Sequence, residues 1–425
     1  MQITQEQARQ ELAAYGGTPV RTTPLPSVGD LSGRRIDEAE IEAVTRVLRS
    51  GKLNSTVGSE TAGWESDFAA FLGVEHAVAC SSGTAALHLA VAAVNPEPGE
   101  EIILTGLSDA GTMLPILAQN AVPVFADVDL RAGNLDPASV AEKITGKTRA
   151  IIAIHLFGIP AAVDELRALA DQHHLILIED CAQAYLTQTA SGALAGTTGQ
   201  LGCFSLQQSK HITAGDGGTV VSNDVALARR ARLFADKAWP RDAPTSATQH
   251  AGSFERTHLF LGLNYRMTEL QSSIARVQLT KLETIVADRR RNAARLTHKL
   301  TGLAGLQCAP EDGTAYWLFP LYLDPELAGA DAFGYAELLR PEGIAGVPGY
   351  IQRPLYCTPV LTGHHTYGTS GYPIADHEYG EGLCPNTEAL IGGRLLTLQW
   401  NENYTDADVD DIAEAITKVH AYLTR

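Results

Sequence analysis

Between residues 77 and 223 the chain alternates short apolar runs with segments of helical or turn composition. The runs are AVAC, EIIL, PVFADVD, RAIIAIH, LILIED, GCFSL and GTVVS. Strands that are apolar on both faces and separated by helices are typical of a mostly parallel sheet covered by helices on both sides. The alternation therefore predicts an α/β protein whose larger domain is built on such a sheet.

The length of the chain, 425 residues, exceeds what one ordinary hydrophobic core accommodates, so we expect two domains. We expect an N-terminal arm over residues 1–35, a large domain over 36–285 and a smaller α/β domain over 286–425. The amphipathic segment at about 267–300 predicts the long helix that joins the two domains.

The charge and the cysteines limit the class of protein. The formal net charge is −17, which is the wrong sign for a nucleic-acid binder, and we interpret the RRR triplet at 289–291 as a solvated helix face. The six cysteines form no CxxC pair, the N-terminus has no apolar signal region, and no apolar run is long enough to span a membrane. We expect a soluble cytoplasmic protein with no nucleic-acid or membrane partner.

Two polar groups follow predicted strands at the same edge of the sheet. The stretch LILIEDCAQA ends a strand with Glu179 and Asp180, and Lys210 lies just past another strand, 30 residues after Asp180. In parallel sheets, ligands bind outside the carboxyl ends of the strands. A turn or capping residue is the alternative interpretation for Asp180, and a surface lysine is the alternative for Lys210.

The stretch SSGTAAL at 81–87 leads from a predicted strand into a helix. Free backbone N–H groups and the positive end of the helix dipole favour a phosphate there, although the same residues also make an ordinary helix cap. A lysine that forms an imine, a carboxylate for a protonated ring nitrogen and a phosphate site are the needs of pyridoxal 5'-phosphate (PLP).

The order of the motifs resembles one family along nearly the whole chain. The matching blocks are GGTPVR, SGKLNSTVGSE, HAVACSSGTAALHLA, PVFADVD, IHLFGIPAAVDEL, IEDCAQA, FSLQQSKHITAGDGGTV and LGLNYRMTELQSSIARVQLTKLE. They are similar to those of the DegT/StrS-type sugar and cyclitol aminotransferases, which are fold-type I PLP enzymes. The resemblance implies a fold-type I large domain, with a mostly parallel sheet covered by helices on both faces, and a smaller C-terminal domain.

The resemblance also implies roles at the ring of the cofactor. Lys210 would form the imine and later carry the proton, and Asp180 would pair with the pyridine nitrogen. Gln183 would reach the ring hydroxyl. His155 matches a histidine near the ring, with a core histidine at a strand end as the alternative.

A second group of residues would hold the phosphate. By the same resemblance these are Ser82, Gly83, Thr84 and Ser205, together with Asn264, which would reach the phosphate of a neighbouring subunit. The last contact implies a homodimer with shared active sites.

Asp109, in TGLSDAGT, stands where the family usually stacks an aromatic residue on the cofactor ring. Three explanations are open: the register differs, another side chain covers the ring, or the pocket recognises something new. A carboxylate there would tune proton transfer, whereas a helix-start cap is the simpler interpretation.

The presence of Lys210 disfavours the dehydration chemistry of relatives that carry histidine in its place. The resemblance therefore implies transamination from glutamate or glutamine to a keto-sugar or ketocyclitol, in amino-sugar or secondary-metabolite biosynthesis such as that of antibiotics. The alternatives are another PLP reaction (an epimerase, lyase or oxidase, given Asp109) and a non-catalytic PLP-binding homologue. The aromatic residues at 316–317 and 350–368 either line a polyol pocket or lie scattered on the surface.

Overall fold

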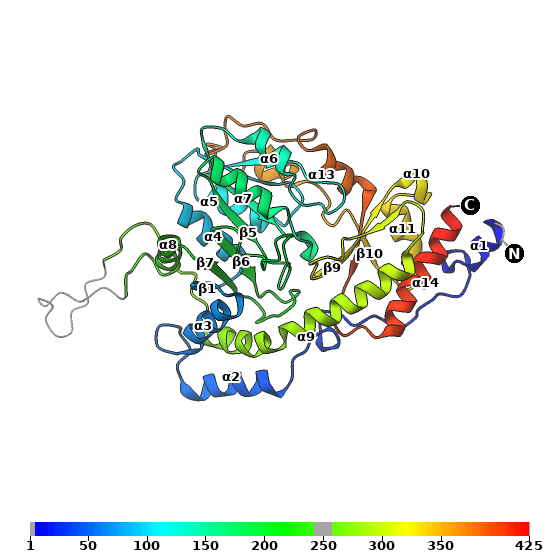
Figure 1. Ribbon diagram of the computed structural model, residues 1–425, viewed down its shortest axis with the longest axis horizontal. Coiled ribbons are helices and arrows are strands. Elements are labelled where there is room, and N and C mark those ends of the chain that lie inside the picture. Colours follow the sequence, from blue (N-terminus) through cyan, green and yellow to red (C-terminus); the bar gives the residue numbers. More distant parts are fainter. Residues whose placement is uncertain (1–4, 242–256, 425) are drawn as a thin grey trace, which may run out of the picture.

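The larger sheet confirms the predicted fold class. The computed structural model describes residues 5–241 and 257–424 (Figure 1), and within them this sheet has seven strands in the order β1-β7-β6-β5-β4-β2-β3. The strands are β1 (His76–Cys80), β2 (Glu101–Thr105), β3 (Val122–Ala126), β4 (Thr148–Ile154), β5 (Ile176–Asp180), β6 (Leu201–Ser205) and β7 (Gly218–Ser222). Strand β7 runs antiparallel to β1 and β6, while the other pairs are parallel.

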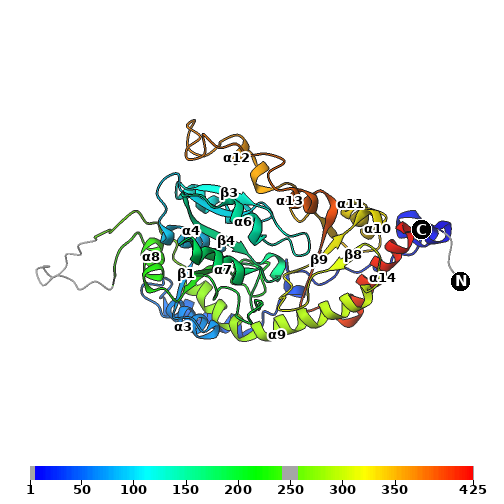
Figure 2. The same cartoon turned by 45° about the horizontal axis from the view of Figure 1, so that its top comes forward.

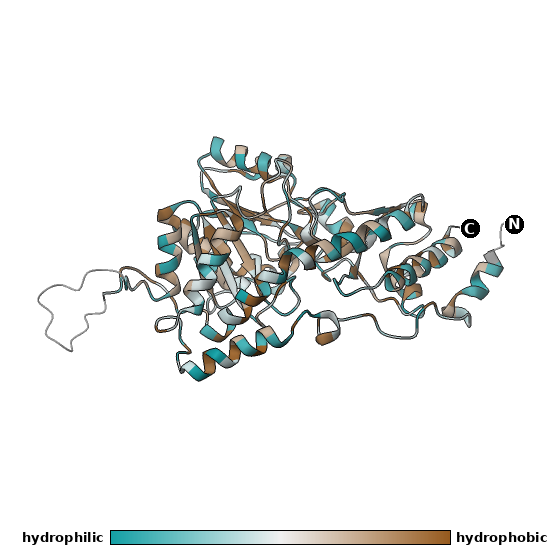
Figure 3. Cartoon of the chain, turned by 60° about the horizontal axis from the view of Figure 1, so that its bottom comes forward, coloured by the Kyte–Doolittle hydropathy of each residue, from teal (hydrophilic) through white to brown (hydrophobic). Residues whose placement is uncertain are grey.

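Helices cover both faces of this sheet because successive side chains of a strand point to opposite sides. On β4, Ile152 packs into one core, and its neighbours Ile151 and Ala153 pack into the other. The first face carries α4 (Gly83–Val94), α5 (Leu114–Ala118) and α8 (Val225–Ala235), and the second carries α6 (Pro137–Lys143) and α7 (Val163–Gln172). The strands are largely hydrophobic, and the outer helices carry both hydrophobic and hydrophilic residues (Figure 3).

A second sheet of four antiparallel strands, in the order β10-β11-β9-β8, builds the smaller unit. Its strands are β8 (Leu306–Cys308), β9 (Leu318–Leu323), β10 (Gly346–Pro348) and β11 (Leu395–Gln399), and its helices include α10 (Pro325–Ala328), α11 (Ala332–Leu339) and α14 (Asp406–Leu423). Among the described residues, no helix has both the length and the apolar character needed to cross a membrane.

The long connecting helix is α9 (Glu269–Leu300). It packs on α2 (Glu38–Ser50) and α3 (Glu60–Leu72) near its start and on α14 further along, while α1 (Gln5–Glu11) lies against α14 (Figure 1). Because α9 passes the expected boundary at 285/286 without a break, the domain limits stay a prediction.

One part of the region expected to form the small domain packs on the large sheet instead. Tyr356 and Ile374 belong to the core that contains β2 and α4, and the Tyr379 hydroxyl donates to the Pro123 carbonyl oxygen at 2.9 Å. This excursion includes α12 (Pro359–Thr362) and leads to α13 (Pro385–Ala389), and it lies beside β3 in Figure 2. Its aromatic side chains, buried Tyr356 and partly buried Tyr379, cover the β3 edge of the sheet.

The expectation that the arginine triplet at 289–291 forms a solvated helix face is wrong for its first member. Arg289 is fully buried and pairs with Glu402, which follows β11, with Nη2 at 2.7 Å from the carboxylate. Arg291 is exposed, as expected. Consecutive side chains on a helix point about 100° apart, so the three arginines cannot share one environment.

Candidate active site

A pocket of about 360 Å³ lies at the carboxyl ends of the parallel strands. The segments that follow β1, β2, β5 and β6 meet there, as ligand sites in parallel sheets do. The predicted site residues that line the pocket are Ser82, Gly83, Thr84, Asp109, Asp180, Gln183, Ser205 and Lys210. His155 and Asn264 do not line the pocket of their own chain.

Lys210 projects into this pocket from the turn after β6. Burial lowers the pKa of its amine to about 8, against the opposing effect of the carboxylates Asp180 and Asp109. Its Nζ lies 4.1 Å from the ring centroid of Trp317. A lysine with a lowered pKa keeps a substantial neutral fraction near pH 7–8, and the neutral amine is the nucleophile that attacks an aldehyde.

Asp180 ends β5 and faces the same pocket. Its carboxylate accepts hydrogen bonds from the N–H of Ala182 at 3.0 Å and from the hydroxyl of Thr112 at 3.1 Å. Burial raises the pKa of Asp180, and these two donors together with Lys210 oppose that rise. A protonated ring nitrogen bound beside it would favour the carboxylate form.

Thr112 is a site residue that the sequence analysis missed. Its hydroxyl contacts both Asp180 and Ser108, the latter at 2.9 Å. Thr112 lies only three residues after Asp109, in the segment TGLSDAGT that the sequence already marked as unusual. A lone threonine in a predicted turn has no pattern that distinguishes it from a capping residue.

The phosphate end is built on the first turn of α4. The Ser82 side chain caps this helix by accepting from the N–H of Ala85 at 3.0 Å. Gly83 allows β6 to approach, because a Cβ there would lie 2.7 Å from the Cβ of Ser205. Thr84 and Ser205 line the pocket beside this turn. Unpaired N–H groups at a helix start suit an anion such as a phosphate.

Gln183 is held at both ends of its amide. Its oxygen accepts from the N–H of Phe157 at 2.7 Å, and its nitrogen donates to the Tyr350 hydroxyl at 3.1 Å. Tyr350 packs edge-on against Trp317, and both rings line the pocket. Tyr316, the neighbour of Trp317, is instead buried in the core of the small sheet.

Asp109 combines two of the alternatives that the sequence left open. Its carboxylate caps the short 3-10 helix Ala110–Thr112 by accepting from the N–H of Gly111 at 2.8 Å. It also lines the pocket, close enough for its charge to favour protonated Lys210. The aromatic side chains Trp317 and Tyr350 line this pocket from the small domain, and the Trp317 ring faces Lys210.

The ring nitrogens of His155 are both engaged outside the pocket. Nε2 donates to the Glu179 carboxylate at 2.9 Å, and Nδ1 accepts from the N–H of Ala161 at 3.1 Å. This arrangement matches the core-histidine alternative, and the role of His155 near the cofactor ring stays a prediction. Asn264 is exposed and forms an isolated bridge with Asp236, so its contact with a neighbouring subunit also stays a prediction.

A family model for the DegT/DnrJ/EryC1/StrS aminotransferases matches residues 34–417. The chain belongs to this family. It is 36% identical to the L-glutamine:2-deoxy-scyllo-inosose aminotransferase of Streptomyces kanamyceticus over 96% of both chains. The solved aminotransferase from Psychrobacter cryohalolentis superposes with a TM-score of 0.82 at 28% identity, covering 95% of this chain and 100% of that one.

A further structural relative carries the cofactor. The E. coli GDP-4-keto-6-deoxy-D-mannose-3-dehydratase, solved with bound hydrated PLP, superposes with a TM-score of 0.80 at 26% identity, covering 93% of this chain and 99% of that one. The pocket described above fits this cofactor, with a buried carboxylate, a lysine of lowered pKa and a helix start lined by glycine and hydroxyl groups. The protein is a PLP-dependent aminotransferase.

Proposed function

We propose that this aminotransferase transfers an amino group from L-glutamine to a ketocyclitol, in the biosynthesis of an aminocyclitol antibiotic. The observation that carries the proposal is the 36% identity, across 96% of both chains, to an enzyme named for that donor and acceptor. Glutamate as the donor and a keto-sugar as the acceptor are the second candidates, because a solved relative of 29% identity contains its TDP-sugar product.

The residues of the pocket have separate tasks in this reaction. When bound, PLP stores the amino group and withdraws electrons through its ring. Asp180 would hold the ring nitrogen, and Gly83, Thr84 and Ser205 would hold the phosphate. Lys210 would bind the cofactor covalently between turnovers and would move the proton at the reacting carbon, a task that suits an amine with a pKa of about 8.

The acceptor would lie against the aromatic wall of Trp317 and Tyr350. Both rings line the pocket, and the Tyr350 hydroxyl adds a polar group beside them. A cyclitol has carbon-bound hydrogens on its faces and hydroxyl groups around its rim, so flat aromatic surfaces with a few polar groups suit it.

We also propose a homodimer in which Asn264 completes the phosphate site of the partner subunit. The same segment exposes Leu259, Leu261 and Leu263, with 83% of Leu261 accessible in the single chain. Exposed apolar side chains grouped in one segment favour burial against another chain. The cysteine pattern supports our further proposal that the enzyme works in the cytoplasm.

A substrate screen tests the proposed reaction. The purified enzyme loaded with PLP is incubated with L-glutamine or L-glutamate and with 2-deoxy-scyllo-inosose or a TDP-linked keto-sugar, and the aminated product is measured by mass spectrometry. We expect the largest kcat/KM for glutamine with the ketocyclitol. Faster amination of the nucleotide-linked sugar would overturn the proposed acceptor.

A further inference from the structure

Three consecutive carbonyl oxygens of the turn that carries Lys210 are held by side chains from outside the large sheet. Arg34 donates through Nη2 to the oxygen of Gln208 and through Nη1 to that of Lys210, the latter at 2.6 Å. Between them, Trp317 donates through Nε1 to the oxygen of Ser209 at 2.8 Å. Arg34 comes from the segment before α2, and Trp317 lies just before β9.

The side chain of Arg34 is buried, which is unusual for an arginine that binds the backbone of a turn. The residue is 5% exposed, and burial lowers the pKa of its guanidinium to about 10, so it stays charged at neutral pH. A buried charge is costly unless hydrogen bonds satisfy it. The planar fork of the guanidinium can donate to two neighbouring carbonyl oxygens at once, which a lysine ammonium cannot match in geometry.

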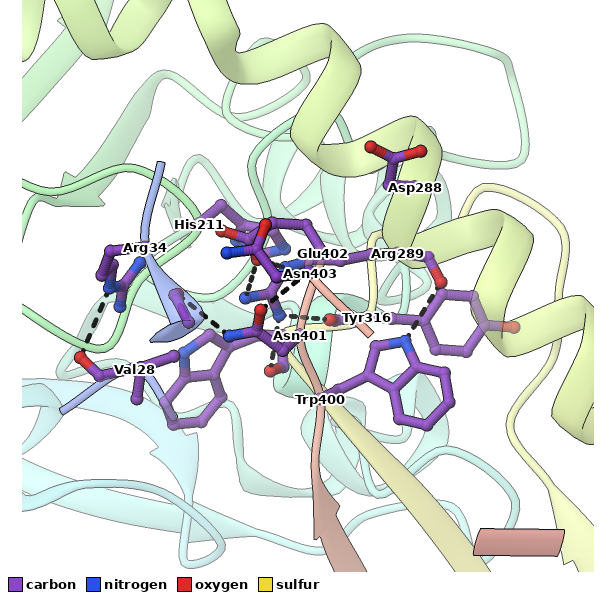
Figure 4. A network of polar contacts seen from close by, with 12 residues as sticks. Val28, Arg34, His211, Asp288, Arg289, Tyr316, Trp400, Asn401, Glu402 and Asn403 are labelled. Carbon is purple, nitrogen blue, oxygen red and sulfur yellow. Dashed lines mark hydrogen bonds and ion pairs between the residues drawn. The ribbon is translucent and has the colours of Figure 1, made fainter. Parts of the chain in front are cut away.

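A second buried arginine supports Trp317 from behind. Arg289 donates through Nη1 to the carbonyl oxygens of Tyr316 at 3.0 Å and Trp317 at 3.1 Å, and Glu402 neutralises it (Figure 4). Tyr316 has a φ of 52°, a left-handed conformation that is unfavourable for a residue with a bulky side chain. Arg289 therefore holds the bend that directs the Trp317 ring toward Lys210.

The segment that carries Arg34 is itself fastened to the small domain. The side-chain amides of Asn401 and Asn403 donate to the carbonyl oxygens of Gly33 and Ser32, each at 3.0 Å. These asparagines follow β11, on either side of Glu402. The N-terminal segment is thus joined by polar contacts to the small domain, where Asn401 lies (Figure 4), and through Arg34 to the turn of the lysine.

We propose that Arg34 is a positioning residue for Lys210. Together with Trp317 it fixes the backbone of the turn and therefore the position of the Lys210 amine in the pocket. The position of this amine then depends on the packing of the N-terminal segment and of the small domain against the turn. This inference rests on the proposed role of Lys210 as the lysine that binds PLP.

The test compares Arg34→Lys with a matched change at Arg290. Arg290 holds three carbonyl oxygens in the same manner, those of Leu186, Gly313 and Thr314, none of which belongs to the lysine turn. Hydrogen–deuterium exchange of the full chain, with and without PLP, is followed by mass spectrometry in peptides that cover residues 206–214. We expect faster exchange there in Arg34→Lys, and wild-type exchange in Arg290→Lys.

The second readout is the rate at which added PLP attaches covalently to cofactor-free protein, followed by absorbance. Because misplacement by about 1 Å can cost as much as about 100-fold in rate, we expect Arg34→Lys to be slower by about 10- to 100-fold. Trp317→Phe keeps an aromatic ring but loses the contact with Ser209, and it should show a smaller change of the same kind. It also serves as the test if Arg34→Lys fails to fold.

Two outcomes separate the inference from the function on which it rests. Unchanged exchange over 206–214 together with an unchanged attachment rate, in a folded Arg34→Lys or Trp317→Phe protein, would overturn the positioning role. Covalent attachment of PLP to Lys210→Ala would instead overturn the role of the lysine, whatever the exchange of the turn shows.

Discussion

Glu179 and Asp180 are adjacent carboxylates at the end of β5, and they face two different regions of the molecule. Glu179 points to the side of α7, where it accepts from His155 and from the backbone N–H groups of Gly196, Thr198 and Gly199. Asp180 points to the side of α4, where it accepts from Ala182 and Thr112 and borders the pocket.

The hydrogen-bond partners of the two carboxylates show which one supports the fold and which one is available to a ligand. Glu179 has a partner on both oxygens and holds a loop, so it has no capacity left for a ligand. Asp180 is buried with fewer donors, and burial raises its pKa because the charge is not fully compensated. A buried charged group that has few hydrogen-bond donors and a perturbed pKa beside a pocket is a candidate to bind a cofactor.

The largest effect is expected on the pocket side. Asp180→Ala should lower kcat by at least about a thousandfold, or about 4 kcal/mol in the barrier, because the ring nitrogen loses its partner. Burial raises the pKa of Asp180 in the folded state, so its charge weakens the cofactor-free fold above that pKa, and its removal should leave thermal stability unchanged or higher. Steady-state kinetics and thermal unfolding check both, and a rate within about tenfold of wild type would contradict this role.

The opposite pattern is expected for the neighbouring carboxylate. Glu179→Gln places an amide nitrogen among N–H donors, and each unsatisfied group costs about 1–3 kcal/mol in the free energy of unfolding. Activity per folded molecule should change less than about tenfold, since no contact with the pocket is lost. Urea unfolding measures the free energy of unfolding. The activity per folded molecule is the steady-state rate divided by the number of sites found by titration with PLP. A rate loss equal to that of Asp180→Ala with normal stability would erase the distinction.

A smaller effect on the pocket side is expected from Thr112→Val. The Thr112 hydroxyl lowers the pKa of Asp180, so its removal should raise that pKa further and weaken the hold on the ring nitrogen. We expect a fall in kcat of about tenfold, which corresponds to about 1.4 kcal/mol. Thr112→Ser retains the hydroxyl and serves as the control, because it should keep most of the activity. Equal losses in both variants would point to packing instead.

The smallest effect is expected at Asp109, whose carboxylate favours protonated Lys210. Asp109→Asn removes that charge, so the pKa of Lys210 should fall below its value of about 8. The neutral amine then persists to lower pH, and the pH midpoint for covalent attachment of PLP should move down. Attachment rates measured as a function of pH test this sign. A midpoint that stays or rises would show that Asp109 acts only as the cap of its 3-10 helix.

The sequence predicted the pocket side of this comparison more fully than the opposite side. Asp180 and Lys210 follow strands, and the parallel arrangement brings the carboxyl ends of strands to one edge, so their proximity could be derived from periodicity. The glycine and serine at the start of α4 carry a local signal for the same reason. Thr112 and the backbone donors around Glu179 lie in turns, where local sequence leaves the direction of a side chain open.

From the sequence alone we could predict the α/β class, the edge of the sheet at which chemistry occurs and the residues placed there by strand ends, because these follow from the apolar pattern within each segment and from the general geometry of parallel sheets. Only the tertiary structure shows that Arg289 is buried, that residues around Tyr356 cover the large sheet, and that Arg34 and Trp317 donate hydrogen bonds to the turn of Lys210. Arg34 lies 176 positions from Lys210 along the chain, and a contact over such a separation leaves no periodic trace in the sequence. The contact between Arg34 and the turn forms only because the N-terminal segment and the small domain pack on the large sheet. That packing depends on many weak contacts, and no single sequence motif indicates them.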